Sequence, residues 1–259
     1  MITSTTQANK KHKVPTAVLR AAAVLFWLLV WHTVAKLLDS ELLFPTPAAT
    51  IIRLCELAKE SDFWLAVCHS LARILAGCTL GIFFGSLLGL VTAMSRVLYE
   101  LFNPLLTVVR STPVASFIIL ALVWIKRDNV AVFIAFLMVL PILWGNVSRG
   151  IAECDRGLIE MAHIFRFSKK DMLTKIYLPS VRPYFFAGCT TALGLSWKAG
   201  VAAEVLSLPK HALGSELYYA KNYLETPTLF AVTLVVILLS LMLELLLKFI
   251  LKRTAELDK

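Results

Sequence analysis

The sequence predicts an all-α integral membrane protein with six transmembrane helices, and two observations support this fold class. First, 58% of the 259 residues are apolar and only 17% are charged, whereas a soluble domain carries about 25% charged residues. Second, six apolar segments approach the ~20 helical residues that cross ~30 Å of hydrocarbon. They lie at residues 17–38, 70–94, 106–125, 129–147, 183–206 and 227–250.

The first segment, residues 17–38, is expected to remain as a membrane anchor. It is too long for a removed signal peptide and lacks a cleavage site of small residues. Residues 1–16 then form an N-terminal tail and residues 17–259 one transmembrane domain. Pro45 and Pro47 end this span, and residues 50–59 have the composition of a short helix lying at the outer surface.

The second segment carries a glycine at every fourth position. Gly77, Gly81, Gly85 and Gly89 lie on one helix face, where they make a groove without side chains that another helix can approach closely. We favour packing within this subunit over a seam between two copies.

The third and fifth segments hold unusual polar residues. Arg110 and Pro113 stand in the first turns of the third segment and weaken its prediction. In the fifth, Thr191, Gly194 and Lys198 recur at helical spacing, and an ionisable group within a span costs about 2.5 to 3.5 kcal/mol on insertion scales. Lys198 either faces a pathway, where it favours anionic cargo, or extends its charge to the outer interface. Glu204, near the outer end, is expected to meet headgroups or water.

The net charge of +9 follows from topology. Of the 26 Lys and Arg residues, 17 fall in the N-terminal tail, the second and fourth connections and the C-terminal end, with Arg96 and Arg110 counted in the second connection. Six fall in the other connections. The positive-inside rule therefore predicts a multi-pass protein of the cell membrane with both termini cytoplasmic, in contact with lipid and not with nucleic acid.

Catalytic and ligand-binding patterns are missing from the sequence. The five His show no H-E-x-x-H spacing, the five Cys form no C-x-x-C pair, and no phosphate-binding G-x-x-x-x-G-K-[ST] loop occurs. Ser196 has no His in the last span to act as its base. We therefore expect no catalytic residue, no metal, no cofactor and no nucleotide hydrolysis in this chain.

The fourth connection, residues 148–182, reads as two short helices. Asp155 can cap a helix over 156–165, and Ser168 to Asp171 fits a capping box that opens a second helix, which should stop by Pro179 before Pro183 starts the fifth span. Ala162 beside Met161, Ile164 and Phe165 makes an apolar knob. Such a knob suits a groove on a soluble partner or, alternatively, the lipid headgroups.

This connection is similar to the EAA loop, E-A-A-x3-G-x9-I-x-L-P, of binding-protein-dependent ABC importer permeases. Glu160, Ala162, Ile176, Leu178 and Pro179 match the motif, while Met161 replaces its second residue, the first alanine, and Arg166 replaces its glycine. The resemblance implies a coupling helix seated in a cleft of the ATPase subunit. The implied coupling residues are Gly157, Glu160, Met161, Ala162, Arg166, Ile176, Leu178 and Pro179.

The resemblance covers roughly residues 42–251. Within the family, the chain is most similar to the nitrate, sulfonate and taurine branch. The residues that carry this likeness are Ser70, Arg73, the run from Arg110 to Pro113, Trp197 and Glu204. It implies a type I (MetI-like) transmembrane domain that works with two ATPase chains, a second permease copy and an extracytoplasmic solute-binding protein. Ser111, Thr112, Thr191 and Lys198 are the candidate lining of the translocation path. A stand-alone secondary carrier and an intramembrane hydrolase are the alternatives.

Overall fold

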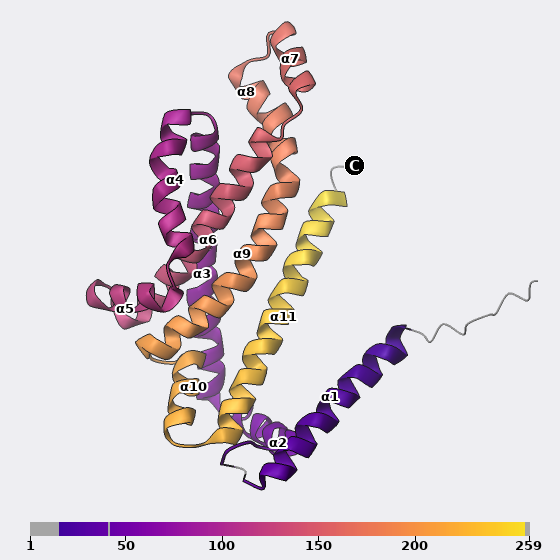
Figure 1. The fold of residues 1–259 in the computed structure, drawn as a ribbon, viewed down its shortest axis with the longest axis vertical. Helices are drawn as coiled ribbons and strands as arrows, with labels where there is room; N and C mark the ends of the chain where they lie inside the picture. Colours follow the sequence, from indigo (N-terminus) through magenta and orange to yellow (C-terminus); the bar gives the residue numbers. More distant parts are fainter. Residues whose placement is uncertain (1–15, 41, 257–259) are drawn as a thin grey trace, which may run out of the picture.

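The computed structural model describes residues 16–40 and 42–256, and within these ranges all regular secondary structure is helical (Figure 1). The predicted tail over residues 1–16 lies outside the described residues except for Thr16. The helices are α1 (Thr16–Leu38), α2 (Pro47–Leu57), α3 (Ser61–Ala93), α4 (Arg96–Ser111), α5 (Val114–Trp124), α6 (Arg127–Ala152), α7 (Arg156–Ile164), α8 (Lys169–Asp171), the π-helical segment η1 (Met172–Tyr177), α9 (Leu178–Ser207), α10 (Leu213–Asn222) and α11 (Thr226–Glu256).

Helices α3, α6 and α9 form the core. The glycine stripe of α3 faces α6 of the same chain, so the backbones approach closely: a Cβ atom at Gly81 would lie 2.6 Å from Val139 Cβ, and one at Gly89 would lie 2.9 Å from the Trp144 carbonyl oxygen. Gly77 and Gly85 face the α6 backbone in the same way. Behind this contact, Ile74, Leu143 and Trp197 join one buried cluster.

Four described helices are long and apolar enough to cross a membrane, namely α1, α3, α6 and α11. The predicted third span, 106–125, is wrong as a single helix, because α4 and α5 meet at a bend of 105°. Pro113 lacks an N–H and disfavours helical geometry in the residue before it, and Thr112 is accordingly extended, with φ −81° and ψ 134°. The bent pair is either a broken span or a re-entrant loop, which raises the number of candidate spans to five.

The predicted fifth span corresponds to α9, which is 30 residues long but is not among the helices apolar enough to count as a candidate span. The expected helix end at Pro179 is also wrong. The chain stays helical from α8 through η1 into α9, and Pro179 lies in the first turn of α9. A wider π turn before it makes room for a residue that has no N–H to donate.

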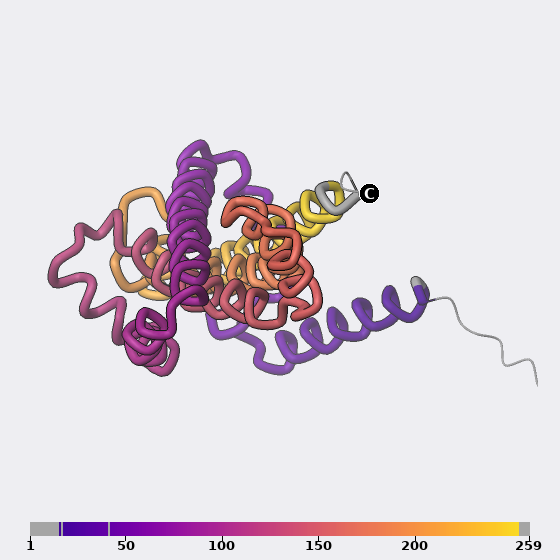
Figure 2. Tube along the Cα trace, turned by 90° about the horizontal axis from the view of Figure 1, so that it is seen from above, coloured from indigo at the N-terminus to yellow at the C-terminus, as the bar shows by residue number. Residues whose placement is uncertain are grey.

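Helix α1 diverges from the bundle, as both views make clear (Figures 1 and 2). Its attachment lies at its end near α2, where Trp31 Nε1 donates to the Pro45 carbonyl oxygen at 3.1 Å and the Trp31 ring packs near Phe230 of α11. Most of the remaining side chains of α1 are exposed within this chain.

Candidate functional site

The hairpin over residues 148–182 projects from one end of the bundle (Figure 1). Its first helix, α7, begins where predicted, because the Asp155 carboxylate accepts the Gly157 N–H at 2.8 Å. The second begins at the predicted capping box, in which Ser168 Oγ accepts the Asp171 N–H at 3.1 Å. These caps satisfy N–H groups that the first turn of a helix otherwise leaves unpaired.

Arg166 keeps the turn that glycine makes in the EAA motif. Its φ is 54°, in the left-handed region. The Phe167 N–H bonds to the Ala162 carbonyl at 2.9 Å, and the Arg166 N–H bonds to the His163 carbonyl at 3.1 Å. This pair of bonds is a Schellman motif, which ends a helix by placing one residue in the left-handed conformation. The arginine therefore preserves the geometry at the cost of backbone strain.

The two faces of α7 differ sharply. Ala162 is fully buried and packs with Cys154 and Ile176, which ties α7 to η1. Ala162 is thus not part of the exposed knob that the sequence predicted. The rest of the helix surface exposes Ile164 (78%) and Phe165 (70%), together with Leu158, Met161 and the charged Glu160. An apolar patch with a carboxylate at its edge, on a rigid capped helix, is suited to binding a groove on another protein.

The second half of the hairpin is held by Lys175. Its Nζ lies 2.7 Å from Asp171 Oδ1 and sits over the Phe167 ring. The hydrogen bonds from Lys175 and Ser168 hold the pKa of the Asp171 carboxyl below its usual value. Beyond η1, Leu178 and Pro179 line an apolar groove of about 890 Å³ between α3 and α9.

The polar residues predicted for the translocation path lie on exposed or half-buried surfaces of two elements. Ser111 and Thr112 stand at the bend between α4 and α5, and both hydroxyls donate to the Val108 carbonyl, at 3.2 and 2.8 Å. Thr191 and Lys198 lie on one exposed stripe of α9, and a Cβ at Gly194 would have no neighbour within 4 Å. The described structure does not join the two pairs by any hydrogen bond.

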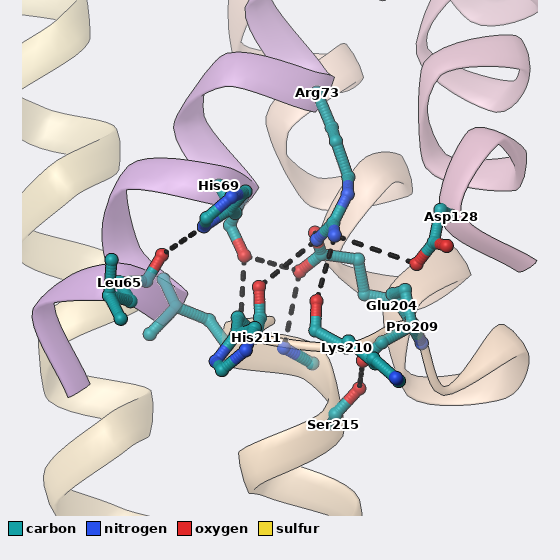
Figure 3. A network of polar contacts seen from close by, with 12 residues as sticks. Leu65, His69, Arg73, Asp128, Glu204, Pro209, Lys210, His211 and Ser215 are labelled. Atoms are coloured by element: carbon teal, nitrogen blue, oxygen red, sulfur yellow. Dashed lines mark hydrogen bonds and ion pairs between the residues drawn. The ribbon is translucent and has the colours of Figure 1, made fainter. Parts of the chain in front are cut away.

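A buried polar network, not predicted from the sequence, joins α3 to the end of α9 (Figure 3). Glu204 is wholly buried, so the expectation that it meets headgroups or water is wrong. Its Oε2 accepts from Ser70 Oγ at 2.7 Å and from the Gly214 N–H at 3.3 Å, and its Oε1 lies 3.5 Å from Arg73 Nη1. A buried carboxylate needs such partners, because an unpaired charge away from water is costly.

Arg73 extends this network to the turn between α9 and α10. It donates to the Lys210 and His211 carbonyls at 2.8 and 3.1 Å and lies 3.6 Å from Asp128 of α6. The turn itself places Leu208 and His211 in the left-handed region. Ser70 and Arg73 were noted in the sequence only as part of the resemblance, and Glu204 lies more than 130 positions from both, so no local signal indicated that they meet.

Fold and site together define a multi-pass helical membrane protein whose hairpin presents an exposed apolar patch at one end of the bundle. The chain belongs to the family of binding-protein-dependent transport system inner membrane components, whose profile matches residues 81–256. It is therefore the permease component of an ABC transporter, an inner-membrane protein that carries no catalytic role of its own.

Among similar proteins, the bicarbonate transport system permease protein CmpB of Synechococcus elongatus is 27% identical over 229 residues, covering 83% of this chain and 82% of that protein. The nitrate import permease protein NrtB of the same organism is 35% identical over 143 residues, covering 55% and 51%. The putative aliphatic sulfonates transport permease protein SsuC of Escherichia coli is 27% identical, covering 76% and 75%.

A solved structure shares the fold. A chain of the MetNI methionine ABC transporter in inward-facing conformations superposes with a TM-score of 0.64 at 18% sequence identity, covering 78% of this chain and 99% of that one.

Proposed function

We propose that this chain forms the translocation path of an ABC importer for a small anionic solute. In this proposal it pairs with a second copy of itself, and two ATPase chains bind its hairpins. An extracytoplasmic binding protein delivers the solute. Relatives named for bicarbonate, nitrate and aliphatic sulfonates support an anionic cargo, because all three are oxyanions.

The coupling role rests on one observation, the rigid exposed face of α7. The helix is held in place because Ala162 packs against Cys154 and Ile176, and its other apolar side chains stay exposed. Closure of the ATPase chains would then move α7 and, through the continuous helix of η1 and α9, the path-lining stripe. In this scheme Glu160, Met161 and Arg166 contact the ATPase. Ala162 and Ile176 hold the hairpin together. Gly157 lies in the first turn of α7, and Leu178 and Pro179 lie in the first turn of α9.

The same proposal assigns six membrane crossings, with α4 and α5 as a broken third crossing and α9 as the fifth. The polar stripe of α9 explains why this helix is less apolar than the four candidate spans, because a helix that lines a path does not need lipid-facing residues on every side. Both chain ends and the hairpin are then cytoplasmic, which agrees with the distribution of basic residues.

Copurification of the ATPase chain with the tagged permease tests the docking role. Glu160→Arg and Phe165→Glu reverse or introduce charge on the exposed face of α7, and both should abolish copurification. Glu153→Arg is the matched control, because Glu153 is also exposed but lies before α7. Ala162→Glu is a poor test, since it buries a charge and disrupts the hairpin itself. Full copurification with both α7 variants would contradict the proposal.

A further inference from the structure

Arg110 belongs to helix α4 and not to the connection in which it was counted from the sequence, and its exposed side chain reaches across to α6. Helix α4 begins at Arg96, so Arg110 stands about 21 Å along the helix axis at 1.5 Å per residue. Its Nη2 donates to the Pro141 carbonyl of α6, and its guanidinium lies 5.4 Å from the Trp144 ring centroid. Both partners lie well before the end of α6 at Ala152. The guanidinium is therefore deep within the membrane part of the chain.

The site that holds Arg110 is built for a guanidinium. A Cβ at Gly145 would lie 2.5 Å from Arg110 Nη2, so a side chain at position 145 would displace the cation. Within the part of the chain that the structure describes, Arg110 forms no ion pair with a carboxylate. A guanidinium carries five N–H donors, and its hydrogen bond to the Pro141 carbonyl leaves donors available. Arg110 thus presents a net positive charge and free donors within a span.

Helix α4 has three faces, and Arg110 belongs to the polar one. The face turned to the bundle holds Phe102, Leu106 and Val109. An exposed apolar face holds Val97, Leu101, Leu105 and Val108. A polar face holds the exposed Glu100, Thr107 and Arg110 and the half-buried Asn103. At about 100° per residue, the centres of these faces are roughly 120° apart. The apolar exposed face suits lipid, so the polar face must turn toward water or another polar surface.

Lys198 is the counterpart of Arg110 on α9. It lies on the exposed stripe with Ala187, Thr191 and Ala202, nine residues before the end of α9 at Ser207, and it also forms no ion pair with a described carboxylate. The neighbours of the two cations, Val109 and Ala199, pack against one apolar cluster. Helices α4 and α9 therefore contact the same apolar cluster, with Arg110 level with the half of α6 next to the hairpin and Lys198 nearer the opposite end.

We propose that Arg110 is an anion-contacting residue of the translocation path, and that with Lys198 it gives a small oxyanion two successive cationic contacts at different depths. The planar fork of a guanidinium matches two oxygens of a carboxylate, sulfonate or nitrate group. This inference rests on the proposed function, since it requires a path along these helices, and it adds α4 to the walls of that path.

Thiol labelling tests the electrostatic claim without knowledge of the cargo. Cys55 and Cys68 are the exposed native cysteines and are replaced by Ser in the full chain, expressed in cell membranes. Thr107→Cys places a thiol one turn from Arg110 on the polar face, and Leu105→Cys places the matched control on the apolar face. Each variant is treated with a sulfonate-bearing and a quaternary-ammonium methanethiosulfonate, and the two rates are compared in variants with Arg110, Arg110→Lys or Arg110→Gln.

We expect Thr107→Cys to react faster with the anionic reagent, and the ratio of the two rates to fall about tenfold in Arg110→Gln but to be largely kept in Arg110→Lys. Leu105→Cys should react with neither charged reagent, because lipid covers it. No reaction at Thr107→Cys, or a ratio unchanged by Arg110→Gln, would overturn the inference. Loss of ATPase copurification in the α7 variants does not depend on this result, so the two proposals fail separately.

Discussion

At the scale of single residues, Arg166 shows that a turn can be kept when its preferred residue is lost. The Schellman bonds around it are intact although its φ is 54°. A non-glycine residue in the left-handed region is strained by about 1 kcal/mol or more. Selection of arginine at this exposed position is consistent with a contact that lies outside this chain.

Arg166→Gly should therefore stabilise the hairpin by about 1 kcal/mol, because glycine adopts the left-handed conformation without strain. Hydrogen exchange at the Phe167 N–H, which closes the turn, should slow about fivefold. Arg166→Val, with a β-branched side chain, should speed that exchange. Faster exchange in the glycine variant would contradict the assigned strain.

Of the contacts in the network of Figure 3, the ion pair of Arg73 with buried Glu204 should contribute most to the stability of the folded protein. Glu204→Ala leaves Arg73, only 14% exposed, without its buried partner, and breaking such a pair costs about 3 to 5 kcal/mol. Asp128→Asn is the control, because Asp128 is 61% exposed and an exposed pair contributes up to about 1 kcal/mol. Thermal unfolding of the purified chain in detergent measures both; equal losses would contradict this assignment.

At the scale of helices, the close contact between α3 and α6 depends on the glycine stripe. Gly81→Leu places its side chain into Val139 and the Phe136 carbonyl, and we expect the folded protein to be lost on detergent extraction, because overpacking costs about 1 to 3 kcal/mol even in softer sites. Gly194→Leu is the matched control: a Cβ there meets nothing within 4 Å, so the fold should survive. Normal yield of Gly81→Leu would contradict the contact.

In helix α10, ionisation of Glu216 lowers the stability of the folded state in a pH-dependent way. Burial, followed by the charges of Glu60, Asp62 and Glu225, raises the pKa of this carboxyl above its usual value of 4.5. Because the folded state holds the proton more tightly, stability falls as the pH rises from 4.5 through the raised pKa, and the cost is fully present above it.

Glu216→Gln should therefore raise the unfolding temperature at pH 7 and flatten the pH dependence above 4.5. Glu60→Gln, which removes one repelling charge, should give a smaller gain in the same direction. Thermal unfolding across pH 4.5 to 8 measures the effect, and a lower unfolding temperature for Glu216→Gln at pH 7 would contradict it.

Several elements could be predicted from local signals in the sequence. The caps at Asp155 and Ser168 and the four-residue glycine spacing each depend on neighbours within one turn or one face, so their geometry follows from periodicity. Pro113 weakened the prediction of a continuous third span, but the angle of the bend could not be predicted, because tertiary packing decides how far a proline bends a chain. The helix end predicted at Pro179 was wrong, because the π turn that precedes this proline has no sequence signature. Glu204 could not be placed, because its partners lie on distant segments.

At the scale of the whole molecule, α9 links two ends with different roles. It emerges from the hairpin through η1, carries the exposed stripe of Thr191 and Lys198, and ends at the buried Glu204 network. We expect movement of α7 to shift the stripe while the network holds the far end of α9 to α3. Helix α1 diverges from the bundle and exposes most of its described apolar side chains within this chain.

The most direct test of this account is ATP-dependent uptake by the complex reconstituted in liposomes with its ATPase and binding protein. Nitrate, bicarbonate and an aliphatic sulfonate serve as labelled solutes. We predict that uptake of at least one of them requires both ATP and the binding protein, is lost in Glu160→Arg and is kept in Glu153→Arg. Uptake driven by an ion gradient without the ATPase, or unchanged in Glu160→Arg, would contradict it.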